Sequence, residues 1–219
     1  MDAMEIVWLI EDDEEQADQY GRLLEIASDN QFRVHYVAVK PHITDYVDLL
    51  ADDRTKAIII DQRLSELSGV PYEGIEVAEF LRAAQPELPI FILTQHSNDD
   101  LLLEKESSVE FVMGKDELTN RDVAYAARIL RNIGRYEAAL SKKQIRLKEL
   151  IDLKLSDELS SSEETELQQL RSDFERPFAQ QLAQQESSWE SDQTSREEFL
   201  QQLQQITQSI RETVNRKDS

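Results

Sequence analysis

The feature that most constrains this chain is an alternation of strand-like and helix-like patterns over its first 134 residues. The run Ala57-Ile58-Ile59-Ile60 is short and wholly apolar, which is typical of a strand buried on both faces of a sheet. The predicted strands cover residues 4–10, 32–39, 57–60, 90–93 and 109–113, and predicted helices begin near residues 17, 43, 74, 99 and 123. Five such repeats predict an α/β fold with a doubly wound parallel sheet and helices on both faces.

Residues 135–219 have a different composition. All five glycines lie at or before Gly134, and Pro177 is the only proline beyond it. Leucine, isoleucine and phenylalanine recur there at helical spacing, and Ser160 followed by Glu163 is a helix start. We therefore divide the chain into residues 1–134 and an all-α extension of residues 135–219, with two to four helices in a hairpin or coiled coil. The sequence allows the last helix of the first region to run unbroken past Gly134.

The apolar stripes of the extension are narrow, and two interpretations stay open. They can close a helical bundle within one chain, or they can serve an oligomerisation or partner-binding element, since narrow seams usually need another helix.

The composition restricts the classes of partner. The formal net charge is −21, which disfavours contact with nucleic acid and with anionic membrane surfaces. The chain has no cysteine, so disulfides and thiolate chemistry are excluded. No apolar run reaches the roughly 18 residues that a membrane span needs. The acidic start of the chain lacks the basic residues of a signal peptide, and we expect a soluble, cytoplasmic protein.

Polar side chains stand at the ends of four predicted strands. Glu11 and Asp12 follow the first strand, Asp61 the third, Thr94 the fourth and Lys115 the fifth. Ligands of open parallel sheets bind at the carboxyl ends of strands, so we expect these side chains to meet. Crowded carboxylates repel one another unless a divalent cation binds them, and hard oxygen ligands suit Mg2+. Each residue alone has an ordinary explanation as a helix cap, strand end or surface lysine; the order and spacing support a site.

This order resembles the receiver domain of response regulators in two-component signalling. The resemblance extends from about Glu5 to Ile133, and the segments LIEDDEEQ, AIIIDQRL, GIEVAEFLRAAQPELPIFILTQHS and FVMGKDEL carry it. It implies a flavodoxin-like (βα)5 sheet and a phosphoprotein that accepts a phosphoryl group from a histidine kinase or a phosphotransfer protein. No enzymatic activity is implied beyond self-phosphorylation and autodephosphorylation.

The resemblance also implies a role for each strand-end residue. Asp61 is the expected phospho-acceptor, Thr94 closes on the phosphoryl group and Lys115 forms a salt bridge to it. The expected Mg2+ ligands are Glu11 through water, Asp12, Asp61 and the backbone carbonyl of Arg63. The output is expected to pass through residues 135–219, by binding a downstream protein effector or by self-association.

The chain departs from the family pattern at several positions. Ser65 stands where the family usually has proline, and Asp116 follows Lys115 where many members have proline. The loop over residues 65–73 is about five residues longer than usual. The aromatic switch position is occupied by Val112, with Phe111 one residue earlier. His96, two residues after the expected Thr, is interpreted as a loop histidine rather than a residue that tunes dephosphorylation.

Other functions fit less well. A haloacid-dehalogenase-type phosphatase needs an aspartate two residues after the nucleophile, and Arg63 occupies that position. The acidic, Gln-rich extension lacks a basic recognition helix, which disfavours a DNA-binding output. A histidine phosphotransfer bundle is excluded because the three histidines, His35, His42 and His96, all precede the extension. The alternative that stays open is a degenerate receiver that acts as a phosphorylation-independent dimeric scaffold or adaptor.

Overall fold

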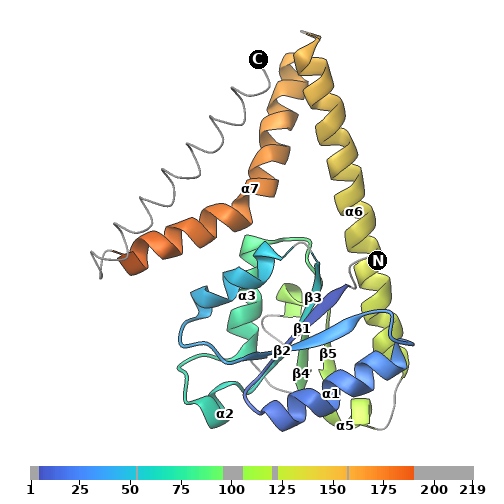
Figure 1. The fold of residues 1–219 in the computed structure, drawn as a ribbon, viewed down its shortest axis with the longest axis vertical. Helices are drawn as coiled ribbons and strands as arrows, with labels where there is room; N and C mark the ends of the chain where they lie inside the picture. Colours follow the sequence, from blue (N-terminus) through green and yellow to red (C-terminus); the bar gives the residue numbers. More distant parts are fainter. Residues whose placement is uncertain (1–4, 53, 96–105, 120–122, 157, 190–219) are drawn as a thin grey trace, which may run out of the picture. The chain divides into compact units, whose positions relative to one another are not determined.

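The sheet of this protein has five parallel strands. The computed structural model describes residues 5–52, 54–95, 106–119, 123–156 and 158–189. The strands are β1 (Ile6–Glu11), β2 (Arg33–Ala38), β3 (Thr55–Asp61), β4 (Ile90–Thr94) and β5 (Phe111–Gly114), in the order β2-β1-β3-β4-β5 (Figure 1). This order is that of flavodoxin-like doubly wound sheets, and it confirms the predicted fold class.

Helical segments connect and follow the strands. They are α1 (Glu14–Ala27), the 3-10 helix η1 (Ile43–Ala51), α2 (Ser65–Ser68), α3 (Gly74–Ala84), the 3-10 turn η2 (Glu106–Ser108), α5 (Lys115–Thr119), α6 (Val123–Leu155) and α7 (Ser161–Trp189). The short helix predicted after residue 41 is a 3-10 helix, and α2 and α5 were not predicted. The helix predicted around residues 99–106 lies outside the described residues except for Glu106.

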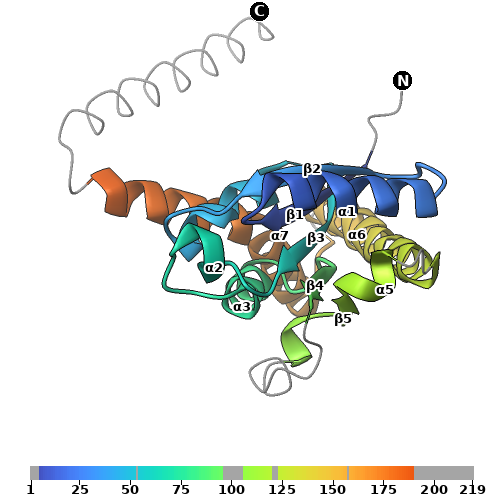
Figure 2. The same cartoon turned by 90° about the horizontal axis from the view of Figure 1, so that it is seen from below.

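Two apolar clusters cover the two faces of the sheet. On one face Ile58 and Ile60 of β3 pack with Leu81 of α3 and Tyr46 of η1. On the other face the alternate strand residues pack with α1 and the first turns of α6, through residues that include Val7, Leu24, Ile59 and Ile129. Figure 2 shows α3 on one side of the sheet and α5 and α6 on the other. Because the central strands are buried on both sides, their apolar runs are continuous.

Helix α6 passes through Gly134 without a break and continues to Leu155. A glycine inside a helix costs only about 1 kcal/mol, and packing at both ends of α6 outweighs that. Leu150 of α6 and Leu167 of α7 are both buried, and Arg146 of α6 pairs with Glu166 of α7 at 2.8 Å. In the described part of the extension up to Phe178, α6 and α7 are thus joined by a buried apolar contact region and an ion pair.

The start of α7 follows its sequence signal. The Ser160 hydroxyl lies 2.6 Å from the Glu163 carboxylate, which also accepts the Ser160 N–H at 3.0 Å. Contacts within the chain separate a compact unit, residues 1–178, from residues 179–219. The apolar stripe predicted over residues 199–210 lies outside the described residues. Among the described helices, none is long and apolar enough to cross a membrane.

Candidate functional site

Three carboxylates meet at the carboxyl ends of β1 and β3. Register pairs Ile10 with Ile60, so the next residues, Glu11 and Asp61, stand side by side. Glu11, Asp12 and Asp61 each offer an oxygen, and these atoms all lie within 4.8 Å of one another. Glu11 is fully buried and Asp61 is 2% exposed, whereas Asp12 is half-buried. The structure thus gathers the acids that the strand-end pattern predicted.

Lys115 reaches the same acid cluster from the junction of β5 and α5. Its Nζ lies 2.7 Å from Asp61 Oδ1 and 3.0 Å from Glu11 Oε2. It also lies 5.5 Å from the centre of the Tyr20 ring. The Lys115 side chain is only 10% exposed, so these are buried charge-assisted contacts. The Lys115 ammonium therefore forms ion pairs with two buried carboxylates.

Burial and the neighbouring charges perturb the pKa values of Glu11, Asp61 and Lys115. Burial and the nearby charge of Asp61 raise the pKa of Glu11 to about 7. Burial also raises the pKa of Asp61, although Lys115 and the Arg63 N–H oppose that rise. Burial works against the ammonium of Lys115, but the two carboxylates outweigh it and raise the lysine pKa. Lys115 therefore stays protonated, but its single positive charge does not fully compensate the negative charges of the buried carboxylates.

The donor set fits a hard divalent cation. Three carboxylates and one ammonium carry a formal charge of −2 when all are ionised. Clustered carboxylate oxygens are the ligands that Mg2+ and similar ions take in proteins. Glu11, Asp12 and Asp61 would hold such an ion. A divalent cation would neutralise the remaining charge of the pocket.

The chain after Asp61 is held close to its backbone. The Arg63 N–H donates to Asp61 Oδ2 at 2.9 Å, which orients the carboxylate. The role of the Arg63 carbonyl as a ligand stays a prediction. A Cβ on Gly74 would lie 2.1 Å from the Asp61 carbonyl oxygen, so only glycine fits at the start of α3. The sequence marked Gly74 as a helix start and gave no sign of this approach.

Thr94 lies at the end of β4, next to the acid cluster. Asp61 pairs with Leu93, so Thr94 stands one residue beyond that pairing, and it is 2% exposed. Phe111 and Val112 are the two candidates for the aromatic switch position. Phe111 packs against Phe91 with ring centres 4.7 Å apart, whereas Val112 packs on the opposite face of the sheet. His96 lies outside the described residues.

The long loop after β3 contributes a contact that sequence reasoning missed. The Leu67 N–H, in α2, donates to Asp12 Oδ2 at 2.9 Å across 55 residues of chain. Ser65 begins α2 and donates its hydroxyl to Glu73 at 2.6 Å. No pattern in a polar stretch such as Ser65–Ser68 points to a contact this distant.

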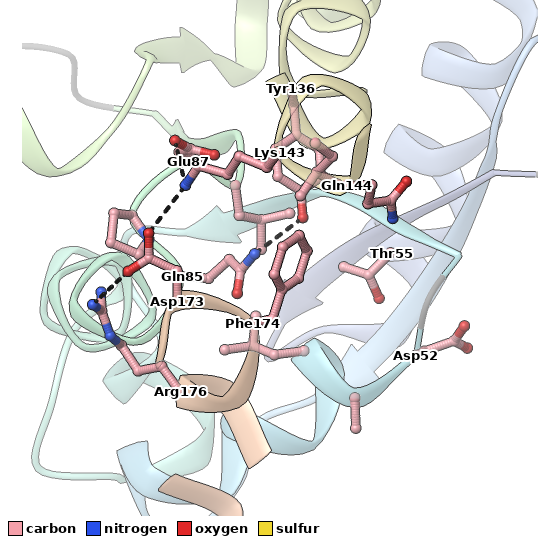
Figure 3. A pocket seen from close by; sticks show the side chains of 15 residues that line it. Asp52, Thr55, Gln85, Glu87, Tyr136, Lys143, Gln144, Asp173, Phe174 and Arg176 are labelled. Carbon is pink, nitrogen blue, oxygen red and sulfur yellow. Dashed lines mark hydrogen bonds and ion pairs between the residues drawn. The ribbon is translucent and has the colours of Figure 1, made fainter. Parts of the chain in front are cut away.

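A cavity lies away from the acid cluster. It has a volume of about 390 Å³ and lies among the end of η1, the α3–β4 connection, α6 and α7 (Figure 3). Lys143 Nζ lies 2.9 Å from Glu87 and 3.4 Å from Asp173, and Asp173 also pairs with Arg176 at 3.1 Å. These charges pair with one another, so the cavity marks the place where the helical hairpin is tied to the sheet domain. The strand-end residues predicted as site residues do not line it.

Comparison with solved structures finds receiver domains. A CheY-like receiver domain protein from Methanospirillum hungatei JF-1 is 14% identical, with a TM-score of 0.47 over 63% of this chain and 99% of that one. The receiver domain of an HD-domain-containing protein from Pseudomonas fluorescens Pf-5 is 18% identical, with a TM-score of 0.46 over 63% and 99%. A CheY-like receiver domain from Methylobacillus flagellatus is 21% identical, with a TM-score of 0.43 over 60% and 99%. A scan against protein-family models and a search of curated proteins find no match.

Proposed function

We propose that this chain is a response regulator whose phospho-acceptor is Asp61. One observation carries the proposal: Asp61 is a buried carboxylate that contacts Lys115 at 2.7 Å and shares a three-carboxylate cluster with Glu11 and Asp12. Phosphoryl transfer requires positioning and charge stabilisation more than covalent chemistry from the protein. An acceptor carboxylate, a cation-binding cluster and a fixed ammonium supply those two requirements.

The reaction assigns a task to each group. A carboxylate oxygen of Asp61 attacks the phosphorus of a phosphohistidine in line with the P–N bond. The O–P bond forms as the P–N bond breaks, and the imidazole leaves with the electron pair and takes up a proton. Lys115 stabilises charge on the phosphoryl oxygens, and the Thr94 hydroxyl donates to one of them. Glu11, Asp12 and Asp61 would hold Mg2+, which would supply further charge neutralisation during the transfer.

The donor in this proposal is a histidine kinase or a phosphotransfer protein. The output passes through the α6–α7 hairpin, by contact with a protein effector or with a second copy of the chain. Support comes from α6, which packs on the sheet at Ile129 and continues without a break to Leu155. The division into functional regions 1–134 and 135–219 is part of this proposal.

A phosphodonor assay tests the acceptor. The full chain is incubated with Mg2+ and acetyl phosphate, and intact-mass spectrometry counts the added phosphoryl groups. The wild-type chain should gain one group, Asp61→Asn none, and Asp116→Asn, which changes an exposed carboxylate next to Lys115, should behave as wild type. Equal labelling of Asp61→Asn would refute the assignment.

The scaffold alternative gives a different pattern. It predicts no labelling of the wild-type chain and an oligomeric state that ignores the phosphodonor. Light scattering with and without acetyl phosphate, on wild type and Asp61→Asn, tests the switch. If the two proteins assemble identically in both conditions while wild type is labelled, phosphorylation does not act by changing self-association of the chain.

A further inference from the structure

The loop between β3 and α3 places α2 beside the start of α1 at the carboxyl end of the sheet (Figure 1). Its closest contact with the candidate site is the hydrogen bond from the Leu67 N–H to Asp12 Oδ2, at 2.9 Å. The Leu67 side chain is 67% exposed, so the fold uses the backbone of this residue and not its side chain. A neutral N–H on one carboxylate oxygen fixes the orientation of Asp12 and leaves its other oxygen for a cation.

The loop is braced at both ends. The Ser65 hydroxyl donates to Glu73 at 2.6 Å, and the Gly74 N–H donates to the Gln62 carbonyl at 3.0 Å. Tyr72 is 5% exposed, and its hydroxyl donates to the Lys40 carbonyl. These contacts attach the loop to neighbouring segments. A segment held in this way can fix the orientation of a ligand residue, whereas an unattached loop would move together with that residue and would not orient it.

Tyr46 adds a further anchor beneath the loop. This residue is fully buried, and its hydroxyl lies 3.2 Å from the Tyr72 hydroxyl and accepts the Lys40 N–H at 3.0 Å. The two tyrosine rings meet edge to face with centres 6.4 Å apart. The long loop is thus built into the core of the domain.

We propose that the Leu67 backbone N–H is a positioning group for the metal ligand Asp12. In this proposal the loop over residues 65–73 holds that N–H in place, next to the cation site. This inference rests on the proposed function, because it assumes that Asp12 binds Mg2+. Outer-layer hydrogen bonds fix the orientation of metal ligands, and their loss weakens metal binding by about 10–100-fold.

The test compares backbone and side-chain changes at one position. Leu67→Pro removes the N–H and places the proline ring where it pointed, at a φ that a helix accepts. Leu67→Ala keeps the N–H and removes most of an exposed side chain. Glu66→Pro removes a different N–H of the same helix and controls for proline itself. Mg2+ affinity of the full chain is measured by isothermal titration calorimetry, with Asp12→Asn as the reference for a lost ligand.

We expect Leu67→Pro to weaken Mg2+ binding by about 10–100-fold, with Leu67→Ala and Glu66→Pro within about threefold of wild type. Unchanged binding by Leu67→Pro would refute the inference, and tighter binding would also refute it, because it would show that the hydrogen bond competes with the ion. If the wild-type chain does not bind Mg2+, the metal site of the proposed function itself fails.

A second variant covers the case in which Leu67→Pro does not fold. Ser65→Ala removes the brace to Glu73 and leaves the Leu67 N–H in place. Weaker Mg2+ binding by Ser65→Ala supports a positioning role of the loop. Wild-type affinity in a folded Ser65→Ala chain refutes the part of the inference that assigns positioning to the braced loop.

Discussion

Replacing Lys115 with methionine is the most direct test of the charge balance at the candidate site. Lys115 pairs with two carboxylates, Asp61 at 2.7 Å and Glu11 at 3.0 Å, and those side chains are 3% and 1% exposed. Methionine has a similar length and fills the same space without a charge. Removing one partner of a buried ion pair leaves the other charge uncompensated, which costs about 3–5 kcal/mol. We expect a loss of that size in the free energy of unfolding without divalent cations.

The loss should depend on pH. Without the ammonium, the pKa values of both carboxyls rise further, so the folded variant binds protons that the unfolded chain has already released. Stability of the variant therefore falls as pH rises through the carboxyl range, and the deficit relative to wild type is largest at pH 8. At pH 5 a proton retained on one of the two carboxyls replaces part of the positive charge that Lys115 supplied. The loss of stability relative to wild type should therefore be smaller at pH 5 than at pH 8, by about 1–2 kcal/mol.

Urea unfolding at pH 5 and pH 8 in EDTA measures both quantities. Lys154→Met is the matched control, because Lys154 pairs with Glu164 at the surface, where both side chains are about half exposed. That control should stay within about 1 kcal/mol of wild type. A Lys115→Met chain that is as stable as the control at pH 8, or a deficit that grows as pH falls, would refute the reasoning. Added Mg2+ should restore stability by binding the folded state.

Three further outcomes follow from the packing and the charges. Because the pKa of Glu11 is raised to about 7, wild-type stability in EDTA should fall by up to about 3 kcal/mol between pH 4.5 and 7, and Glu11→Gln should flatten that slope in urea unfolding. Gly74→Ala should cost more than about 2 kcal/mol, because a Cβ meets a backbone oxygen at 2.1 Å, whereas Gly134→Ala, with open space around it in α6, should stabilise by about 0.5–1 kcal/mol in thermal unfolding. Leu167→Ala should lower the stability of the α6–α7 hairpin by about 2–5 kcal/mol, which would be detected as faster proteolysis of the hairpin. Leu155→Ala, which changes an 81% exposed side chain, should leave the proteolysis rate unchanged.

The sheet and the acid cluster could be predicted because both follow from short-range patterns. Wholly apolar runs such as Ile58–Ile60 identify buried parallel strands, and the strand order then brings strand-end residues to one edge. Asp61 and Lys115 are 54 positions apart in sequence and still meet, because Asp61 ends β3 and Lys115 directly follows β5 of the same sheet. The identity of the residues at strand ends therefore carried the information about the site.

The contacts of the long loop could not be predicted in the same way, and the change of composition at Gly134 did not fix where the last helix of the first region ends. The polar stretch around Ser65 has no periodicity, and its hydrogen bond to Asp12 depends on where two distant segments meet. Gly134 is the last glycine and separates two compositions, and α6 continues through it, as the sequence allowed. Composition records how often a residue is used, whereas a helix ends only where capping or packing favours an end.

The first turns of α6 connect the candidate site to the hairpin. Gly114, which precedes Lys115, donates its N–H to the Tyr125 hydroxyl at 3.2 Å, and Tyr125 donates to Glu117 of α5. The Tyr125 ring stacks on Phe111 with centres 5.9 Å apart. Tyr125 therefore links the backbone of Gly114, the residue before Lys115, to the first turn of a helix about 50 Å long. A stiff helix moved at one end carries that motion to its other end, so under the proposed function the Tyr125 contacts are one physical connection between the candidate site and the hairpin.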